Sequence, residues 1–162
     1  MPDRKTAYPG IAACLAVGLI AASAGAEPVR GFAWMADTFE GNISLVYGST
    51  ETEEDYLFGL LCRRDGASTT LYVDIPGTRA GQPLTLELGA GKAKVALQAK
   101  IATDAMSGFH FVEARDFKLT PVIALLKEKG PVTARTGDLI ERLPEKGRVA
   151  AVSAFAEICK LD

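Results

Sequence analysis

The side chains that could act as a nucleophile and its base are few in this chain. Its only histidine is His110, which stands between Phe109 and Phe111. Catalysis of the Ser-His-Asp or Cys-His kind needs a base beside the nucleophile. In a strand, the imidazole of His110 would point away from its two aromatic neighbours, so we expect it on the protein surface. The sequence therefore predicts no catalytic residue of this kind.

Carboxylates are the second group that could do chemistry. The densest acidic run consists of Glu51, Glu53, Glu54 and Asp55. Paired carboxylates hydrolyse glycosidic bonds, so a hydrolase that acts on envelope polymers through this run is one alternative. Consecutive acidic residues in a loop are more often a solvated surface, and their spacing does not match a calcium-binding loop. We therefore predict no catalytic residue, no metal and no cofactor.

Aromatic side chains near the start of the chain are candidates for recognition. Trp34 is the only tryptophan, and Phe32 lies two residues before it. A buried place in the core is the first expectation for Trp34. Because interfaces are often anchored by aromatic residues, Trp34 and Phe32 are also candidates for binding a partner. The weak periodicity between Glu27 and Asn42 leaves open a flexible arm that carries them.

The first 26 residues have the pattern of a secretory signal peptide. Arg4 and Lys5 precede the apolar run 11–22, and the small residues Ala24-Gly25-Ala26 follow it. This order predicts cleavage after Ala26 and a periplasmic or secreted protein. The alternatives are an uncleaved anchor, although the apolar run is shorter than a bilayer span requires, and a lipoprotein modified at Cys14. After cleavage we expect no stable membrane span.

Two cysteines remain after this predicted cleavage, Cys62 and Cys159. Disulfides form and persist in oxidising compartments, so we predict that these two cysteines are bonded to each other. The alternatives are two buried thiols or a zinc site, and zinc needs four ligands in a chain with one histidine. The two cysteines lack the C-x-x-C spacing of a redox-active pair.

The overall composition is that of a globular protein. The chain has 162 residues, of which 48% are hydrophobic and 23% are charged, and its formal net charge is −2. A charge so close to balance provides no field that would attract nucleic acid or an anionic membrane. We expect a protein partner in the envelope and no nucleic acid. No linker or repeat divides residues 27–162, which we predict to be a single domain.

Alternating apolar residues and closely spaced turns predict an antiparallel sheet. Strands are expected at 42–48, 56–64, 71–75, 84–88, 95–101, 109–115 and 132–136. A helix is predicted to begin at Thr120-Pro121 and to end at Gly130, and a second helix to span Glu145 to Lys160. Residues 138–143 fit a strand or a helix cap. The predicted fold is α+β, an antiparallel β-rich single domain with two helices and about seven or eight strands, sandwich-like or a curved sheet.

Four short segments carry a resemblance to a known family. They are Leu60-Leu61-Cys62, Thr70-Leu71-Tyr72-Val73, the helix from Pro121 to Leu126, and Glu157-Ile158-Cys159. Together they resemble the periplasmic accessory proteins associated with type VI secretion, the TagO/VasI-like group. This resemblance implies a small exported accessory protein and supplies no catalytic residue. The leading hypothesis is an exported periplasmic, non-enzymatic binding or accessory protein of the cell envelope. The alternatives are the hydrolase described above and an inhibitor or immunity-type protein.

Overall fold

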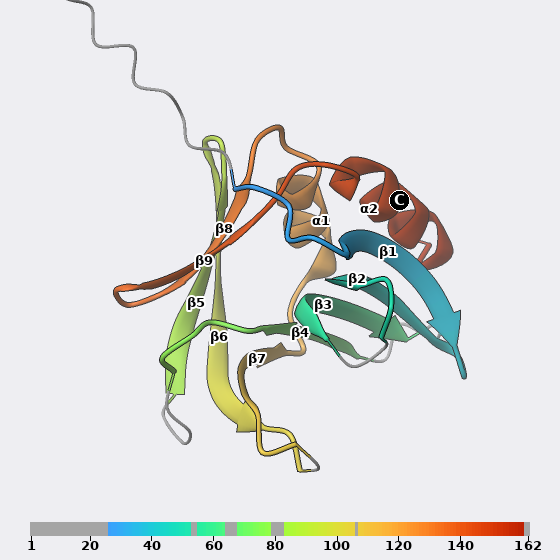
Figure 1. The fold of residues 1–162 in the computed structure, drawn as a ribbon. Coiled ribbons are helices and arrows are strands. Elements are labelled where there is room, and N and C mark those ends of the chain that lie inside the picture. Colours follow the sequence, from blue (N-terminus) through green and yellow to red (C-terminus); the bar gives the residue numbers. More distant parts are fainter. Residues whose placement is uncertain (1–25, 53–54, 64–67, 79–82, 106, 161–162) are drawn as a thin grey trace, which may run out of the picture.

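The computed structural model describes residues 26–52, 55–63, 68–78, 83–105 and 107–160 (Figure 1). The predicted signal peptide, apart from Ala26, lies outside the described residues. In the described part of the chain, nine strands form one sheet in the order β1-β2-β3-β4-β7-β6-β5-β8-β9. The strands are β1 Phe32–Phe39, β2 Asn42–Ser49, β3 Tyr56–Arg63, β4 Thr69–Val73, β5 Pro83–Ala90, β6 Ala93–Thr103, β7 His110–Arg115, β8 Val132–Thr136 and β9 Leu139–Leu143. Every neighbouring pair is antiparallel.

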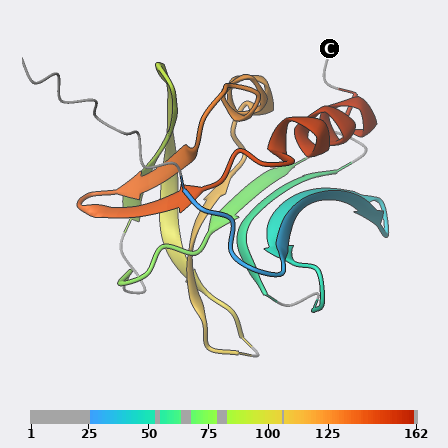
Figure 2. The same ribbon diagram turned by 45° about the horizontal axis from the view of Figure 1, so that its top comes forward.

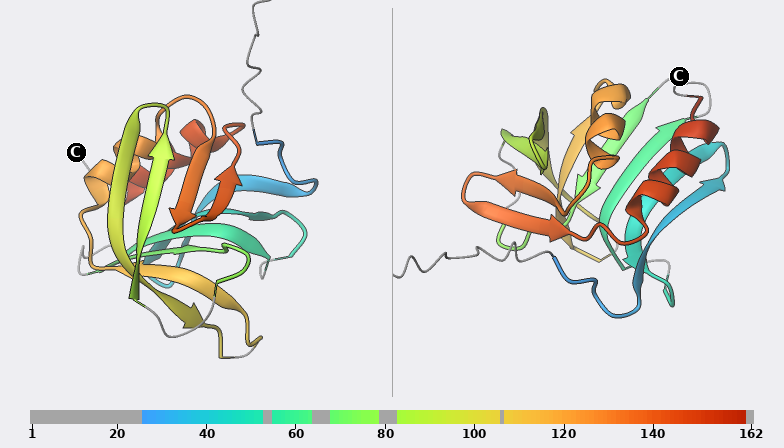
Figure 3. Two further views of the ribbon diagram at one scale, coloured as in Figure 1. Left: turned by 90° about the vertical axis from the view of Figure 1, so that its left-hand side faces the viewer. Right: turned by 90° about the horizontal axis from the view of Figure 1, so that it is seen from above.

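The sheet curls into a half-barrel, and both helices of the described chain lie within its curve (Figures 2 and 3). Helix α1 spans Leu119–Leu126 and helix α2 spans Arg148–Ile158. Helix α1 packs against β5 and β6, whereas α2 packs against β1 and β2. The predicted class, an antiparallel β-rich α+β fold with two helices, is confirmed.

The described residues form more strands than the sequence predicted, and the extra strands are the two edges of the sheet. Strand β1 forms where the sequence left open a flexible arm, and β9 forms in the ambiguous segment 138–143. An edge strand has a neighbour on one side only, so its burial pattern is weaker and harder to detect.

The helix boundaries also differ from the prediction. Helix α1 ends at Leu126 and α2 at Ile158, earlier than the predicted ends at Gly130 and Lys160. The N-termini differ as well. Helix α1 begins at Leu119 after Lys118, so Thr120 lies in its first turn and does not cap it. Pro121 still lies in the first turn, where a backbone N–H would have no intrahelical partner. Helix α2 begins after Gly147, whose φ of 81° is a left-handed conformation that favours glycine. This turn shortens the predicted helix at its start.

The core lies between the inner face of the sheet and the helices. Its largest fully buried apolar side chains from the sheet include Ile43, Leu45, Tyr47, Phe58, Leu60, Leu71, Leu86 and Leu88, which alternate with less buried residues along most of these strands. The helices add Val122, Leu125, Leu126, Val152 and Phe155. Trp34 belongs to this core with 7% of its surface exposed, and its indole Nε1 donates to the Pro144 carbonyl at 2.9 Å. This bond ties edge strand β1 to the segment that leads into α2.

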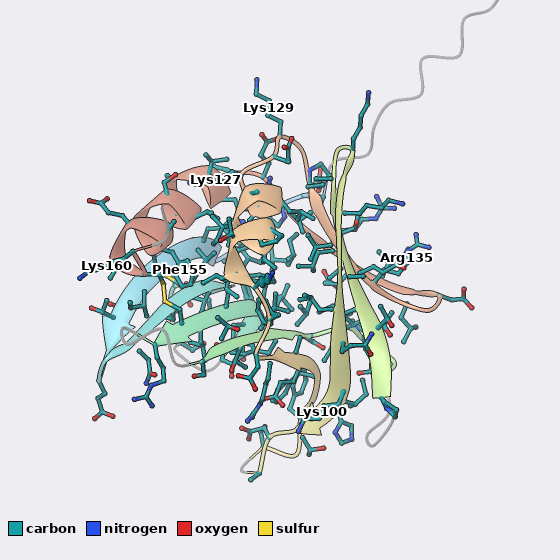
Figure 4. The ribbon with its side chains drawn as sticks, turned by 180° about the vertical axis from the view of Figure 1, so that it is seen from behind. Lys100, Lys127, Lys129, Arg135, Phe155 and Lys160 are labelled. Atoms are coloured by element: carbon teal, nitrogen blue, oxygen red, sulfur yellow. A yellow bond between two sulfur atoms is a disulfide. The ribbon has the colours of Figure 1, made fainter. Side chains whose placement is uncertain are left out.

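Cys62 and Cys159 are joined in a disulfide, as the compartment argument predicted. Cys62 lies near the end of β3, Cys159 caps the C-terminus of α2, and their Cα atoms are 6.5 Å apart. In Figure 4 the sulfur pair lies beneath α2, near Phe155. The bridge connects positions 97 residues apart. A cross-link that closes so long a loop stabilises a domain by about 2–4 kcal/mol.

A buried arginine joins the two helices. Arg148, the first residue of α2, has no exposed surface. Its Nε donates to the Leu126 carbonyl at 2.8 Å, one Nη donates to the carbonyls of Glu128 and Gly130, and the other donates to Pro144. Burial lowers the pKa of this guanidinium, and the nearby Glu145 carboxylate opposes that shift. The guanidinium thus satisfies carbonyls at the C-terminal end of α1, where a cation is favourable.

Candidate ligand-binding pocket

Several strands begin or end together at one end of the sheet. Because neighbouring strands are antiparallel, the starts of β1, β3 and β7 lie at the same end as the ends of β2, β4 and β6. A pocket of about 700 Å³ opens there. This volume is within the usual range of small-molecule sites. We refer to it as the aromatic pocket.

Aromatic rings from different strands line the aromatic pocket. They are Phe32, Tyr56, Tyr72, Phe109 and Phe111. The Tyr72 ring is central, because its centroid is 4.9 Å from that of Tyr56 and 6.1 Å from that of Phe111. Phe109 is half exposed at the rim. Aromatic rings in such tilted and edge-to-face arrangements stabilise one another's positions.

A glycine on the neighbouring strand leaves room for the Tyr72 ring. Gly59 on β3 is the direct cross-strand neighbour of Tyr72 on β4. The ring of Tyr72 lies on the Gly59 backbone so closely that a Cβ at this position would overlap the ring. Any other residue at position 59 would therefore displace Tyr72. The glycine fixes the position of the pocket's central side chain.

Carboxylates also line the aromatic pocket, and they come from three separate loops. Asp55 precedes β3, Asp74 follows β4, and Asp104 follows β6. The Asp104 Oδ1 accepts hydrogen bonds from the Ser107 backbone N–H at 2.7 Å and from its hydroxyl at 2.9 Å. The Asp55 Oδ2 accepts one from the Thr52 hydroxyl at 3.0 Å. Among the described residues that line the pocket, none is lysine or arginine.

Burial at the pocket shifts the pKa of several of these groups upward. Desolvation raises the pKa of the Asp74 carboxyl. Burial raises the pKa of Tyr72 to about 12, with a smaller contribution from Tyr56. The pKa of Tyr56 is raised by burial and then by the charge of Asp104. On β9, burial raises the pKa of Glu141, and the Asp74 charge adds to this shift. Tyr56, Tyr72 and Asp74 are therefore partly removed from water.

A different carboxylate on the same sheet has a structural role. Glu113 on β7 is 6% exposed, and it lies 2.6 Å from the Arg115 guanidinium and 3.5 Å from the Lys100 ammonium. The hydrogen bond and the charge of Glu113 raise the pKa of Arg115. Since two bases face this one carboxylate, the group is already neutralised within the fold.

A second pocket lies between β5, β6 and β8, with a volume of about 670 Å³. It is lined by both an acid and a base, Glu87 and Arg135, which are cross-strand partners. Next to it, the hairpin of β8 and β9 projects from the body of the protein (Figure 2). Leu139 and Ile140 are exposed apolar residues of this hairpin. Because its charges are mixed, this pocket shows no preference for ligands of one sign.

The candidate residues from the sequence lie in different places in the structure. Trp34 is buried in the core, the place first expected for it, and Phe32 lines the aromatic pocket. Their role in partner binding stays a prediction, and for Trp34 it would require the buried ring to become accessible. The exposed His110 shares a hydrogen bond with the Thr103 hydroxyl at 2.9 Å.

The acidic run is divided by the structure. Glu51 is exposed and Asp55 lines the aromatic pocket, while Glu53 and Glu54 lie outside the described residues. Among the described residues, no cluster of three or more His, Cys, Asp or Glu side chains is placed to hold a metal ion. Neither described helix has the length and apolar character that crossing a bilayer requires.

The pocket's central residues were not identified from the sequence. Tyr72 alternates with the inward-facing Leu71 and Val73, so its outward position was visible in the pattern. The convergence of Asp74 and Asp104 was not visible, because it depends on β4 pairing with β7 and β7 with β6.

Comparison with protein-family models, with curated proteins and with solved structures gives no match for this chain.

Proposed function

We propose that this chain is an exported, non-enzymatic binding or accessory protein of the cell envelope, and that the aromatic pocket is its ligand-binding site. The observation that carries this proposal is the pocket itself, in which aromatic rings and carboxylates from separate strands and loops converge around about 700 Å³. Binding sites combine a concave, largely apolar lining with a few polar groups that orient the ligand.

The scaffold around the pocket supports a role in binding. Tyr72, Phe111 and Tyr56 belong to paired strands, and the disulfide ties β3 to the last helix. Side chains on braced strands lose little freedom when a ligand binds, and this favours affinity. A disulfide is typical of proteins that function outside the cytosol, so the cysteine pair supports export.

The place of the protein in the envelope is part of the proposal. The segments that resemble type VI secretion accessory proteins include Leu60-Leu61-Cys62 and Glu157-Ile158-Cys159. They meet at the disulfide, since Cys62 and Cys159 are bonded. The resemblance supports an accessory role beside a secretion system, with a protein partner in the envelope.

Hydrolysis of an envelope polymer is the second candidate function. One observation favours it, because Asp55, Asp74 and Asp104 line the same pocket and the pKa of Asp74 is raised. A carboxyl with a raised pKa beside an ionised one is the arrangement of glycosidases. Release of soluble fragments from purified envelope polymer by the wild type, and its loss in Asp74→Asn, would favour this alternative over binding alone.

Position-specific crosslinking in envelope extracts tests the binding proposal. A benzophenone side chain is placed at Phe109 on the pocket rim, at Ile140 on the projecting hairpin, or at Val149, which is exposed on α2. We expect one defined adduct from position 109 that is lost when Tyr72 is replaced by Leu. Adducts from position 140 alone would favour an inhibitor or immunity-type protein. Equal labelling from all positions would contradict a binding role for the pocket.

A further inference from the structure

We infer that the aromatic pocket is a site for an organic cation, a ligand group with ammonium or guanidinium chemistry, and this deepens and rests on the proposed function. The pocket is lined by several aromatic rings and by three carboxylates from separate loops. The first component attracts a cation through the ring electrons, and the second attracts it through charge.

Three of the aromatic rings that line the pocket lie close to one another. Tyr56, Tyr72 and Phe111 form a row of rings with centroid separations of 4.9 and 6.1 Å and interplanar angles of 51° and 67°. A cation within about 6 Å of such a ring centroid is bound by its quadrupole, and the interaction strengthens as water is excluded.

The charged component has one sign. Asp55, Asp74 and Asp104 line the pocket, and no lysine or arginine is among its described lining residues. Glu113 is a carboxylate of the opposite kind, because it faces the two bases Arg115 and Lys100. The protein therefore neutralises that carboxylate internally, whereas Asp74 lines a pocket with no lysine or arginine among its described lining residues.

The raised pKa of Asp74 supports the same conclusion independently of the charge count. Its shift comes from burial, and a basic neighbour would have shifted it in the opposite direction. A carboxylate that is partly desolvated gains more from an incoming cation than one in full contact with water.

The pocket volume indicates the size of the ligand, and the second pocket is a control for its charge. A space of about 700 Å³ is larger than a single ammonium group and has room for the stem that carries it. The pocket between β5, β6 and β8 has a similar volume but contains Arg135 beside Glu87. It therefore provides an internal comparison, because the same cation should not bind there.

The test is a titration of the disulfide-bonded, ¹⁵N-labelled protein with n-butylammonium, followed in ¹H–¹⁵N correlation spectra. Neutral n-butanol, which has the same number of heavy atoms, is the matched probe. We expect saturable shifts at the amides of Leu57, Tyr72 and Phe111, with a Kd of about 1 to 10 mM for so small a ligand. Butanol should bind at least roughly threefold more weakly, because it lacks the charge. The amides of Glu87 and Arg135 should not shift.

Two variants distinguish the loss of a pocket charge from a loss of folding. Asp74→Asn should weaken n-butylammonium binding by roughly threefold to tenfold, because one carboxylate charge is removed from a partly solvated pocket. Glu157→Gln removes one exposed carboxylate from α2, far along the chain from the pocket, and should leave the Kd unchanged. Retention of the wild-type peak dispersion in both variants shows that the fold is intact.

Peptides distinguish the source of the cation. The probes are acetyl-Gly-Lys-Gly-amide and the same peptide with norleucine in place of lysine. Tighter binding of the lysine peptide than of n-butylammonium would assign the cation to a polypeptide partner, and equal binding would assign it to a small amine. Either result supports the cation site.

Equal affinity for n-butylammonium and n-butanol, or no saturable shift at the pocket with any cationic probe, would overturn the inference. Such a result leaves the proposed function in place if crosslinking from position 109 still gives one adduct that depends on Tyr72. Loss of that adduct contradicts the proposed function itself, so the two failures are distinguishable.

Discussion

Replacement of the buried Arg148 by Met gives the sharpest prediction about how the fold is held together. Methionine keeps most of the apolar stem of the side chain, is shorter than arginine, and lacks the guanidinium. The guanidinium donates to the carbonyls of Leu126 at 2.8 Å, of Gly130 at 2.9 Å and of Pro144 at 3.5 Å, and also to that of Glu128.

The expected magnitude follows from which of these carbonyls water can reach. The contacts with Leu126 and Pro144 are buried, whereas those with Glu128 and Gly130 are partly buried and can be hydrated after the substitution. Each buried acceptor left without a donor costs about 1–3 kcal/mol. The arginine no longer has to be desolvated, and this offsets part of the cost. We therefore expect the free energy of unfolding to fall by about 3 kcal/mol, out of the 5–15 kcal/mol typical of a domain.

Urea unfolding of the disulfide-bonded protein, followed by the fluorescence of the single buried Trp34, measures this loss. With an m-value of about 2 kcal/mol/M, the midpoint should fall by roughly 1.5 M. Arg142→Met, at an exposed position on β9, is the matched control and should change stability by less than about 0.5 kcal/mol. Arg148→Lys should lie between the wild type and Arg148→Met. A midpoint for Arg148→Met equal to that of Arg142→Met would refute the proposed bracing of α1 by α2.

Three further predictions concern the bridge and the pocket. The double variant Cys62→Ser, Cys159→Ser should lose about 2–4 kcal/mol in urea unfolding, and the wild type in reductant should lose the same amount. An unchanged midpoint in both would contradict a stabilising role for the disulfide. Gly59→Ala should displace the Tyr72 ring and abolish the pocket shifts with n-butylammonium, while peaks from β8 stay in place; a wild-type Kd would show that the ring is not seated by this glycine. Asp74→Asn should remove one component of the pH dependence of stability. Burial raises the pKa of Asp74, so the folded protein binds this proton more tightly than the unfolded chain, and stability from this group falls as the pH rises above its ordinary value of 3.8. Asp55, Asp104, Tyr56 and Tyr72 line the same pocket as this carboxyl, and Glu141 on β9 interacts with its charge. The comparison with Asp74→Asn, in unfolding curves at several pH values, therefore isolates the share of Asp74. A wild-type pH profile in the variant would show that Asp74 is not desolvated.

The fold class was predictable because the inner strands carry an alternating apolar pattern. The two edge strands were not, since Trp34 on β1 and Leu143 on β9 are buried by partners distant in sequence. The disulfide was predicted from the cysteine count and from the predicted export of the chain. The buried Arg148 was unpredictable, because a charged residue is favourable there only when the carbonyls of Leu126, Glu128 and Gly130 are brought around it.

The candidate site was only partly accessible to sequence reasoning. Phe32 and Asp55 were singled out and both line the aromatic pocket, although neither is its centre. Tyr72 is central because Gly59 on the neighbouring strand leaves space for its ring, and this depends on strand register. A one-residue change of register would place Tyr72 elsewhere, so composition and local pattern could not predict the site.

Crosslinking from position 109 in the disulfide-bonded protein shows whether the aromatic pocket binds a ligand. A ligand-binding role for the aromatic pocket predicts a single defined adduct that disappears in Tyr72→Leu and is not obtained from Val149. An adduct that persists unchanged in Tyr72→Leu, or one that forms equally from position 149, would contradict it.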